Sequence, residues 1–310
     1  MSTHTDTLGP VLTVTTEPAE PAGGDVVTAT AVLVNNCPFP LRGAVLYLVD
    51  PGRTTAARAV PLGDVRRGAQ VTRIWRTSMP ADAAGDLSFT AHVVFDVDGR
   101  SADCARAAKT VSLPYEPNGV RDPYRTFATT DDARFGQYGS RLVIWAGGRD
   151  LSGGLDEKGG ILLPGSAAES SVVQVRTVGL TGSDNPTAKY GIAVANDLTA
   201  PEKGGYAVLT MSKSYGVEFM TDSDGDGHLD TWAGGGVSSH PAWLRLVREG
   251  TTCTAYSSTD NGLAWKEIGR VTVPSASGAL DAGVVASAVN LDHPGTTVRA
   301  VFDHFTVERS

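Results

Sequence analysis

The feature that most constrains the fold is a repeated alternation of apolar and polar side chains with a period of two, interrupted by turn-forming residues. The alternation begins at residues 11–16 and resumes at residues 25–35, after a Pro-Ala-Gly-Gly turn at residues 21–24. Successive side chains of a β-strand point to opposite faces, so such runs are typical of strands with one buried face. We find no run at helical spacing that extends for three turns, and the sequence therefore predicts an all-β protein.

The first half of the chain contains enough strands for one sandwich. The runs lie at residues 11–16, 25–35, 42–49, 57–62, 70–77, 87–97 and 107–113. Their number and spacing favour a seven-stranded immunoglobulin-like sandwich. The Asp98-Gly99 dipeptide is the signal for a two-residue hairpin between the last two strands.

The second half resumes the same pattern with more strands. The runs lie at residues 141–145, 160–163, 171–178, 189–196, 206–212, 216–221, 243–249, 252–258, 265–272, 282–288 and 297–306. This many strands predict a jelly-roll sandwich made of two sheets.

A polar, proline-bearing stretch without periodicity separates the two halves. A chain of 310 residues is about twice the usual domain size, which fits two domains. We expect four parts, each domain folding independently: a flexible tail at residues 1–9, an immunoglobulin-like domain at 10–114, a linker at 115–132 and a jelly roll at 133–310.

The charge and hydropathy of the chain limit which binding partners and which cellular compartments fit the sequence. The chain has 34 acidic and 26 basic residues, and a net charge of −8 repels a phosphate backbone, so we expect no nucleic-acid partner. No stretch approaches the roughly 20 apolar residues that cross a bilayer, and the first residues lack the pattern of a signal peptide. Either the chain stays in the cytoplasm or it is a piece of a longer secreted, extracellular polypeptide.

The three cysteines leave the compartment open. Cys37 and Cys104 both lie in the first half, so one bridge between them is possible and would indicate an oxidising compartment. Whether their Cα atoms come within bridging distance is not decided by sequence. Cys253 lies in an alternating strand and is expected to be a small buried apolar residue.

The strongest local signal is an acidic loop, Asp-Ser-Asp-Gly-Asp-Gly-His-Leu-Asp, at residues 222–230. Carboxylates at every second position, with glycine between them, can surround a hard cation with oxygen, and the seventh position adds a backbone carbonyl. The expected ligands of a structural calcium ion are Asp222, Asp224, Asp226, Asp230 and the carbonyl of His228. An EF-hand has glutamate at position twelve, where this chain has Ala233, so water or a distant carboxylate would complete the site. The alternative is an exposed acidic hairpin.

The first half also resembles a known family. Asn35-Asn36, Leu62-Gly63-Asp64-Val65 followed by Gly68, and the segment at residues 79–85 are similar to the immunoglobulin-like module that accompanies carbohydrate-binding modules in bacterial α-galactosidases. The resemblance covers about residues 10–114. It implies a spacer without chemistry of its own.

The second half resembles the laminin-G/concanavalin-A-like modules of actinobacterial secreted glycosidases. The resemblance covers about residues 140–309 and rests on these segments: 156–161, 191–197, 205–209, 222–227, 243–248, 257–262 and 302–307. It implies a lectin-like module. That family usually has an aromatic residue where this chain has Lys158, which weakens a surface that could stack on sugar.

The tryptophans are the natural candidates for sugar contacts, because an aromatic face stacks on the C–H face of a pyranose ring. Trp243 and Trp265 lie in alternating strands, so we expect them in the core, and Trp75 and Trp145 follow the same pattern. Trp232 lies in a glycine-rich hairpin tip, where it contacts either a ligand or the acidic loop. The candidate ligand-binding residues are Trp232, Tyr190 and Tyr206.

Motifs for catalysis are not found. A concanavalin-like glycosidase needs two carboxylates on one strand, and the nearest pair is Glu218 with Asp222, of which Asp222 already serves the acidic loop. The leading hypothesis is a non-catalytic accessory pair, a spacer and a lectin-like module, that directs a covalently linked hydrolase to carbohydrate. The alternatives are purely structural or protein-docking modules, and a hydrolase with an unrecognised site. An exposed strip of Trp and Tyr on one sheet favours the first hypothesis, and a face filled with small residues favours the second.

Overall fold

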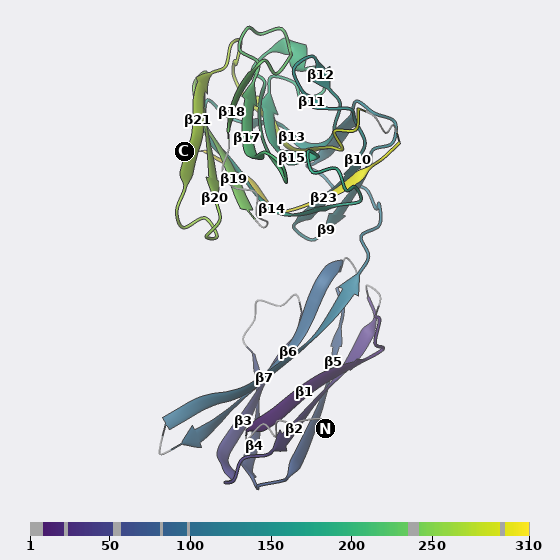
Figure 1. Cartoon of the computed structure of the whole chain (residues 1–310), viewed down its shortest axis with the longest axis vertical. Helices are drawn as coiled ribbons and strands as arrows, with labels where there is room; N and C mark the ends of the chain where they lie inside the picture. The colour runs from purple at the N-terminus through teal and green to yellow at the C-terminus, as the bar shows by residue number, and fades with distance from the viewer. Residues whose placement is uncertain are drawn as a thin grey trace, which may run out of the picture. The chain divides into compact units, whose positions relative to one another are not determined.

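The structure is a computed structural model that describes residues 9–21, 24–51, 57–80, 83–97, 100–234, 242–291 and 295–309. The expected tail at residues 1–9 therefore lies, except for Gly9, outside the described residues, as does the Asp98-Gly99 turn. The protein is all-β, and strands make up both halves of the chain (Figure 1). None of the helical structure in the described residues is long and apolar enough to span a membrane.

The chain divides into two compact units, unit 1 at Met1–Tyr115 and unit 2 at Glu116–Ser310. Residues 116–132, expected to be a linker, are instead part of unit 2. Within them β8 (Arg125–Ala128) pairs with a strand of unit 2, and Gly119 forms a parallel bridge with Gly136. The stretch lacks alternation because it is a short edge strand flanked by turns, which leaves too few residues for a pattern to be visible.

Unit 1 has two antiparallel sheets. One contains three strands in the order β1-β2-β5, and the other contains four in the order β4-β3-β6-β7. The bounds are β1 (Pro10–Glu17), β2 (Val26–Asn35), β3 (Leu41–Val49), β4 (Arg58–Val65), β5 (Gln70–Ser78), β6 (Gly85–Val97) and β7 (Arg100–Leu113). Every strand expected in this half is present.

The core of unit 1 is made of the inward residues of both sheets, among them Leu33, Leu46 and Phe89. Trp75 is buried there as expected, and its indole N–H donates a hydrogen bond to Asp50 Oδ1 at 2.9 Å. Cys37 carries a free, buried thiol, and burial raises the pKa of that thiol. The side chain of Cys104, the other cysteine of this half, lies outside the described part of the structure.

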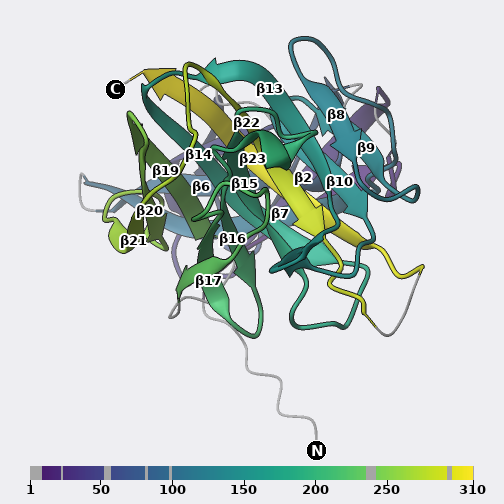
Figure 2. The ribbon, with the colours of Figure 1, turned by 90° about the horizontal axis from the view of Figure 1, so that it is seen from above.

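Unit 2 has two seven-stranded sheets, here called sheet I and sheet II. Sheet I has the order β21-β20-β19-β14-β23-β10-β9, and Figure 2 shows β14, β23 and β10 next to one another. Its bounds are β9 (Arg134–Tyr138), β10 (Arg141–Ala146), β14 (Ser170–Thr181), β19 (Ala242–Glu249), β20 (Thr252–Ser258), β21 (Lys266–Thr272) and β23 (Val298–Arg309).

Sheet II has the order β18-β17-β16-β15-β22-β13-β8. Besides β8 it contains β13 (Gly159–Ala167), β15 (Lys189–Ala195), β16 (Ala207–Ser212), β17 (Gly216–Thr221), β18 (Thr231–Gly234) and β22 (Leu280–Ser287). A small hairpin, β11 (Leu151–Ser152) and β12 (Leu155–Asp156), and a 3-10 turn, η1 (Pro201–Lys203), lie outside the two sheets. All strands expected in this half are present, and the short β8, β9, β11, β12 and β18 were not anticipated.

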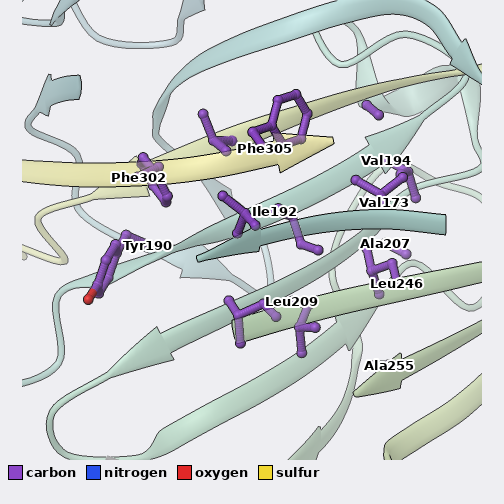
Figure 3. Close-up of a cluster of buried hydrophobic side chains, with 14 of the residues drawn as sticks. Val173, Tyr190, Ile192, Val194, Ala207, Leu209, Leu246, Ala255, Phe302 and Phe305 are labelled. Atoms are coloured by element: carbon purple, nitrogen blue, oxygen red, sulfur yellow. The ribbon is translucent and has the colours of Figure 1, made fainter. Parts of the chain in front are cut away.

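The main core of unit 2 lies between the two sheets. Sheet I contributes Val173, Leu246 and Phe302, and sheet II contributes Ile192 and Leu209, as Figure 3 shows. Cys253, expected to be buried, belongs to this core. The alternation of β14 and β19 follows from this packing, because only every second side chain faces the other sheet.

A second, smaller core covers the other face of sheet II. It includes Ala193, Val208 and Met220 from the sheet, together with Leu151 and Leu229 from segments that fold over it. The strands β15, β16 and β17 are consequently buried on both faces. This explains why their sequence is apolar almost throughout, whereas one-sided strands alternate.

Candidate functional site

The acidic loop joins β17 to β18 at an end of sheet II. Two of its glycines have positive φ, +84° at Gly225 and +92° at Gly227, a conformation that side-chain-bearing residues rarely adopt. A Cβ atom at Gly227 would lie 2.6 Å from the Cα atom of Glu202, so this position also requires the close approach that only glycine permits. The glycine spacing therefore sets the path of the loop.

The carboxylate of Asp222 organises the loop from within. This residue is buried, and its Oδ1 accepts hydrogen bonds from the backbone N–H groups of Gly225 at 2.7 Å and Asp226 at 3.2 Å. Its Oδ2 accepts from the N–H of Gly227 at 2.9 Å. Three amides thus point at one carboxylate, which compensates the cost of burying the charge.

Asp224 and Asp226 turn toward the same point. One carboxylate oxygen from each of Asp222, Asp224 and Asp226 lies within 4.8 Å of the other two. A calcium ion bound about 2.3–2.6 Å from its ligands can lie between oxygens at this separation. The three residues therefore fit a hard divalent cation.

Asp230 has other partners, and the side chain and N–H of His228, whose carbonyl was the expected ligand, face Asp226. Asp230 accepts hydrogen bonds from the N–H and the hydroxyl of Ser223, at 2.8 and 2.7 Å, and the hydroxyl lowers the pKa of Asp230. The His228 imidazole lies 3.2 Å from Asp226 Oδ2, and the backbone N–H of His228 lowers the pKa of Asp226. Asp230 therefore closes the loop onto Ser223 and does not join the three gathered carboxylates.

The acidic loop is tied to the second core of unit 2. Leu229 is buried in that core, and its carbonyl accepts a hydrogen bond from the N–H of Gly153 at 2.9 Å. This bond connects the loop to the β11–β12 hairpin, which also folds over sheet II. The loop is thus an integrated part of the fold and not a free hairpin tip.

The three candidate ligand-binding aromatic residues lie in different environments. Trp232 is 59% exposed, and its indole N–H donates to Glu218 Oε1 at 3.1 Å, so its ring edge is held while part of the side chain faces solvent. Tyr190 and Tyr206 are fully buried. The expectation that these two tyrosines contact a ligand is corrected, because core packing leaves neither ring a free face.

Lys158, where the resembling family has an aromatic residue, is also fully buried. Its ammonium pairs with Asp156 and lies 5.9 Å from the ring centre of Phe127 and 5.1 Å from that of Tyr206. The Tyr206 hydroxyl donates to the other oxygen of Asp156 at 2.7 Å. This position is part of the interior and not of a sugar-binding surface.

The expectation of a core location is also corrected for Trp145, Trp243 and Trp265, which are only half-buried. Trp243 lies between the inward residues Ala242 and Leu244 of β19, so it points to the outer face of sheet I. The sequence shows that the side chains of β19 alternate between two faces. Which of the two sets faces the core depends on how β19 pairs with β14. Trp243-x-Arg245 was the available signal, since an arginine two residues away shares the face of the tryptophan.

An aromatic–arginine face, defined by Trp243, Arg245, Tyr256 and Trp265, lies on this outer side. The Arg245 guanidinium is 3.7 Å from the ring centre of Trp265. Arg245 is in register with Tyr256, and its Nε and Nη2 donate to Gln174 Oε1 at 3.0 and 2.6 Å. The arginine is therefore fixed between an amide and an indole ring.

A cleft of about 270 Å³ lies beside this face and is lined by Trp265, Asp260, Ser258 and Lys266, among others. The Asp260 carboxylate accepts hydrogen bonds from Ser258 Oγ at 2.7 Å and from the N–H of Ala264 at 2.9 Å. These bonds hold the turn that carries Trp265 into position. The cleft thus combines an aromatic wall with hydroxyl, carboxylate and ammonium groups.

Glu218 and Asp222, the nearest approach to a carboxylate pair, have separate roles. Glu218 is buried and bonded to the Trp232 indole, and Asp222 is held by the amides of the acidic loop. Their arrangement does not provide an acid and a nucleophile facing one shared bond.

No family model matches the chain, and no curated protein matches its sequence. Several solved structures are similar at low identity. One is a functionally unknown protein from Saccharomyces cerevisiae, with 16% identity, a TM-score of 0.45 and coverage of 60% of this chain and 96% of that chain. Another is the GH43 BlXynB protein from Bacillus licheniformis, with 12% identity, a TM-score of 0.41 and coverage of 91% of this chain and 63% of that chain.

A third similar structure is the exoplasmic/lumenal domain of VIP36 in a form bound to Ca²⁺ and Man2. It has 12% identity and a TM-score of 0.36, and the match covers 62% of this chain and 86% of that chain. All three TM-scores lie below 0.5, so these likenesses support no assignment of family, ligand or activity.

Proposed function

We propose that the protein is a non-catalytic accessory pair in which unit 1 is an immunoglobulin-like spacer and unit 2 is a lectin-like, jelly-roll module that binds carbohydrate. In this proposal a calcium ion stabilises unit 2, and the pair directs a covalently linked hydrolase to an extracellular polysaccharide. Different observations support the carbohydrate site, the calcium site and the spacer, and the proposal depends most on the carbohydrate site.

The observation that carries the proposal is the Trp265 cleft beside the aromatic–arginine face. A flat indole wall suits the C–H face of a sugar ring, while Asp260 and Lys266 offer acceptors and donors to its hydroxyls. Because Arg245 already covers one side of the Trp265 ring at 3.7 Å, the ring orientation is set before a ligand arrives. Such pre-organisation lowers the entropy cost of binding.

The calcium part rests on the acidic loop. Three converging carboxylates with oxygens within 4.8 Å of one another match a hard cation that prefers oxygen ligands. The loop carries Leu229 into the second core, so an ion there would reinforce the cover of sheet II. Its role would be structural.

The spacer part rests on the sheets of unit 1. Three strands in one sheet and four in the other, with a core between them, suit an immunoglobulin-like sandwich.

The test is a pull-down with insoluble polysaccharides, using the full chain and the variant Trp265→Ala. We expect the variant to bind about tenfold more weakly, a loss of about 1.4 kcal/mol. Leu263→Ala is the matched control, because Leu263 is 87% exposed in the same turn and does not line the cleft. Trp232→Ala tests the tryptophan of the hairpin. Binding that survives both tryptophan changes, or no binding at all, would refute the proposal.

A purely structural or docking role is the second candidate, and one observation favours it. The face of sheet II opposite the main core is closed by the second core, with the small residues Ala193 and Ala195 on β15 beneath it. That face therefore offers no exposed aromatic strip among the described residues. Trp232 on β18 is exposed on that side of sheet II, so Trp232 and the outer face of sheet I together distinguish the two candidates.

A further inference from the structure

A pocket of about 820 Å³ opens among the loops at one end of unit 2. Its lining includes Asp150, Asp184, Lys189, Tyr215, Val289 and Asn290. Tyr215 directly precedes β17, whereas the acidic loop directly follows that strand. The pocket and the acidic loop therefore lie at opposite ends of β17, separated by roughly 17 Å of strand. The volume falls within the range of about 300–1,000 Å³ that is usual for small-molecule sites.

A buried charge pair lines this pocket. The Lys189 side chain is 6% exposed, and its ammonium lies 3.0 Å from Asp150 Oδ1 and 3.3 Å from the carbonyl oxygen of Leu151. An ammonium has three N–H donors, and these two contacts use two of them. The Asp150 side chain is 22% exposed, so the pair has both a donor and an acceptor available toward the pocket.

Asn290 adds a second polar group that lacks its own partner. The residue is 8% exposed and lines the pocket, and its side-chain Nδ2 has no hydrogen-bond partner within the described part of the chain. Its backbone N–H donates to the carbonyl of Gly148 at 2.9 Å, which fixes its position. Buried polar groups are nearly always satisfied, so an unpaired amide in a pocket wall points to a ligand or a bound water.

The backbone next to Asn290 is strained. Val289 has φ +50°, a left-handed conformation that is rare for a β-branched residue. The Asn185 side chain bonds the carbonyls of both Ala288 and Val289, and Ala288 donates to the carbonyl of Gly147 at 2.9 Å. Strain held by such bonds is common at ligand sites, where it sets the direction of a neighbouring side chain.

The chemistry of the lining selects the ligand. Lys189 is neutralised by Asp150, and Asp184 adds a negative charge, so the pocket has no excess positive charge to attract an anion. The lining offers donors at Lys189 and Asn290 and carboxylate acceptors at Asp150 and Asp184, and Tyr215 adds an aromatic surface that is 53% exposed. We infer that this pocket binds a neutral, polyhydroxylated ligand, a monosaccharide unit of a glycan, through Asn290, Asp150, Lys189 and Tyr215.

This inference shares the ligand class of the proposed function but not its site. The Trp265 cleft lies beside sheet I, whereas this pocket lies at the end of sheet II where β17 begins. An experiment can therefore refute ligand binding at one of these two sites and support it at the other.

The experiment is a titration of isotope-labelled full chain with methyl glycosides of glucose, galactose, mannose and xylose, followed by amide chemical shifts. We expect at least one glycoside to produce saturable shifts at Gly148, Lys189 and the Asn290 side-chain amide. Asn290→Asp, which replaces the amide donor with an acceptor at equal size, should weaken that binding at least tenfold. Tyr215→Ala, at the exposed rim where folding is not at risk, should weaken it about threefold.

Trp265→Ala is the matched control and should leave the glycoside affinity unchanged. Shifts confined to Trp265 and Arg245 would overturn the pocket while supporting the proposed function. Shifts at the pocket, with no binding of the chain to insoluble polysaccharide, would support the pocket and contradict the proposed function. Absence of shifts with all four glycosides, pocket shifts with inorganic phosphate alone, or an unchanged affinity in both pocket variants would each refute the inference.

Discussion

At the scale of single residues, the evenly spaced carboxylates of the acidic loop have two different roles, shaping the loop and offering ligands to a cation. Asp222 is satisfied by the amides of Gly225, Asp226 and Gly227, so it shapes the loop without a cation. Asp224 and Asp226 are exposed and lie close to it, so like-charge repulsion falls mainly on these two. A cation would relieve that repulsion without rebuilding the loop.

We therefore expect calcium to raise the melting temperature of the full chain. At a hundredfold excess over Kd the gain is about 2.7 kcal/mol, and a domain of this size gains about 2–4 °C per kcal/mol. The double variant Asp224→Ala, Asp226→Ala should melt at the same temperature in calcium and in chelator. Differential scanning calorimetry measures both, and equal melting temperatures of the unchanged protein in calcium and chelator would contradict a metal site.

Lys158 and Lys203 show how burial sets the value of an ion pair. Lys158 is fully buried against Asp156, and burial lowers its pKa while Asp156 opposes that shift. Lys203 pairs with Asp197 at 2.6 Å but its side chain is 58% exposed. Removing one partner of a buried pair leaves an uncompensated charge, whereas water replaces a lost partner at the surface.

Lys158→Ala should therefore lower the free energy of unfolding by about 3–5 kcal/mol. Lys203→Ala, the matched control, should lower it far less, because the Lys203 side chain is 58% exposed and water replaces the lost partner. Urea denaturation followed by tryptophan fluorescence compares them directly. Similar losses in the two variants would show that the Lys158 ammonium is not buried in solution.

At the scale of elements, the segment from β15 to η1 is closed by one aspartate. Asp197 Oδ1 accepts from the N–H and hydroxyl of Thr199 at 2.9 and 2.6 Å, and its Oδ2 pairs with Lys203. The Lys203 ammonium, followed by the Thr199 hydroxyl, lowers the pKa of Asp197 to about 2. The carboxylate thus holds the turn in its ionised form.

The pH dependence follows from the sign of that shift. The folded-state pKa lies below the ordinary value, so the stabilisation is complete above about pH 4 and is lost as the pH falls toward 2. Asp197→Asn should cost about 1 kcal/mol or less at pH 7, since the pair is partly exposed. The cost should vanish near pH 2. Chemical denaturation at several pH values measures it, with exposed Asp131→Asn as control, and a cost that does not change with pH would contradict it.

At the scale of the whole molecule, each unit has its own sheets and its own core. The described core residues of unit 1 all precede Glu116, and those of unit 2 all follow it. The strand ladders likewise remain within a unit. A unit with a separate core can fold alone when its boundary falls in exposed chain.

We expect residues 1–115 and 116–310, produced separately, each to unfold in a single cooperative transition. Circular dichroism melting curves should add up to that of the full chain. A fragment that begins at residue 133 is the informative control, because it lacks β8 and should be clearly less stable than 116–310. A fragment 116–310 that is unfolded alone would refute the independence of the units.

The strands of both units were predictable because the alternation that identifies a strand lies within a short stretch of sequence. Alternation at β1 or β19 needs only a stretch of about eight residues, and glycine spacing in the acidic loop sets its turn without help from distant segments. Short strands such as β8 and β18 were missed, since four residues are too few to show a period. The three gathered carboxylates of the acidic loop were also predictable, because they lie within five residues of one another.

What only the tertiary structure decided was the environment of side chains whose neighbours are distant in sequence. Trp243 faces outward because β19 pairs with β14 in one register, and Tyr190 is buried because Phe302 packs against it. The pocket brings Asp150 and Asn290, from two separate loops, together with Lys189 at the start of β15. Local sequence sets which residues form a strand and how a turn closes, but burial and proximity depend on which strands meet. That choice is made by the free energy of packing the whole unit.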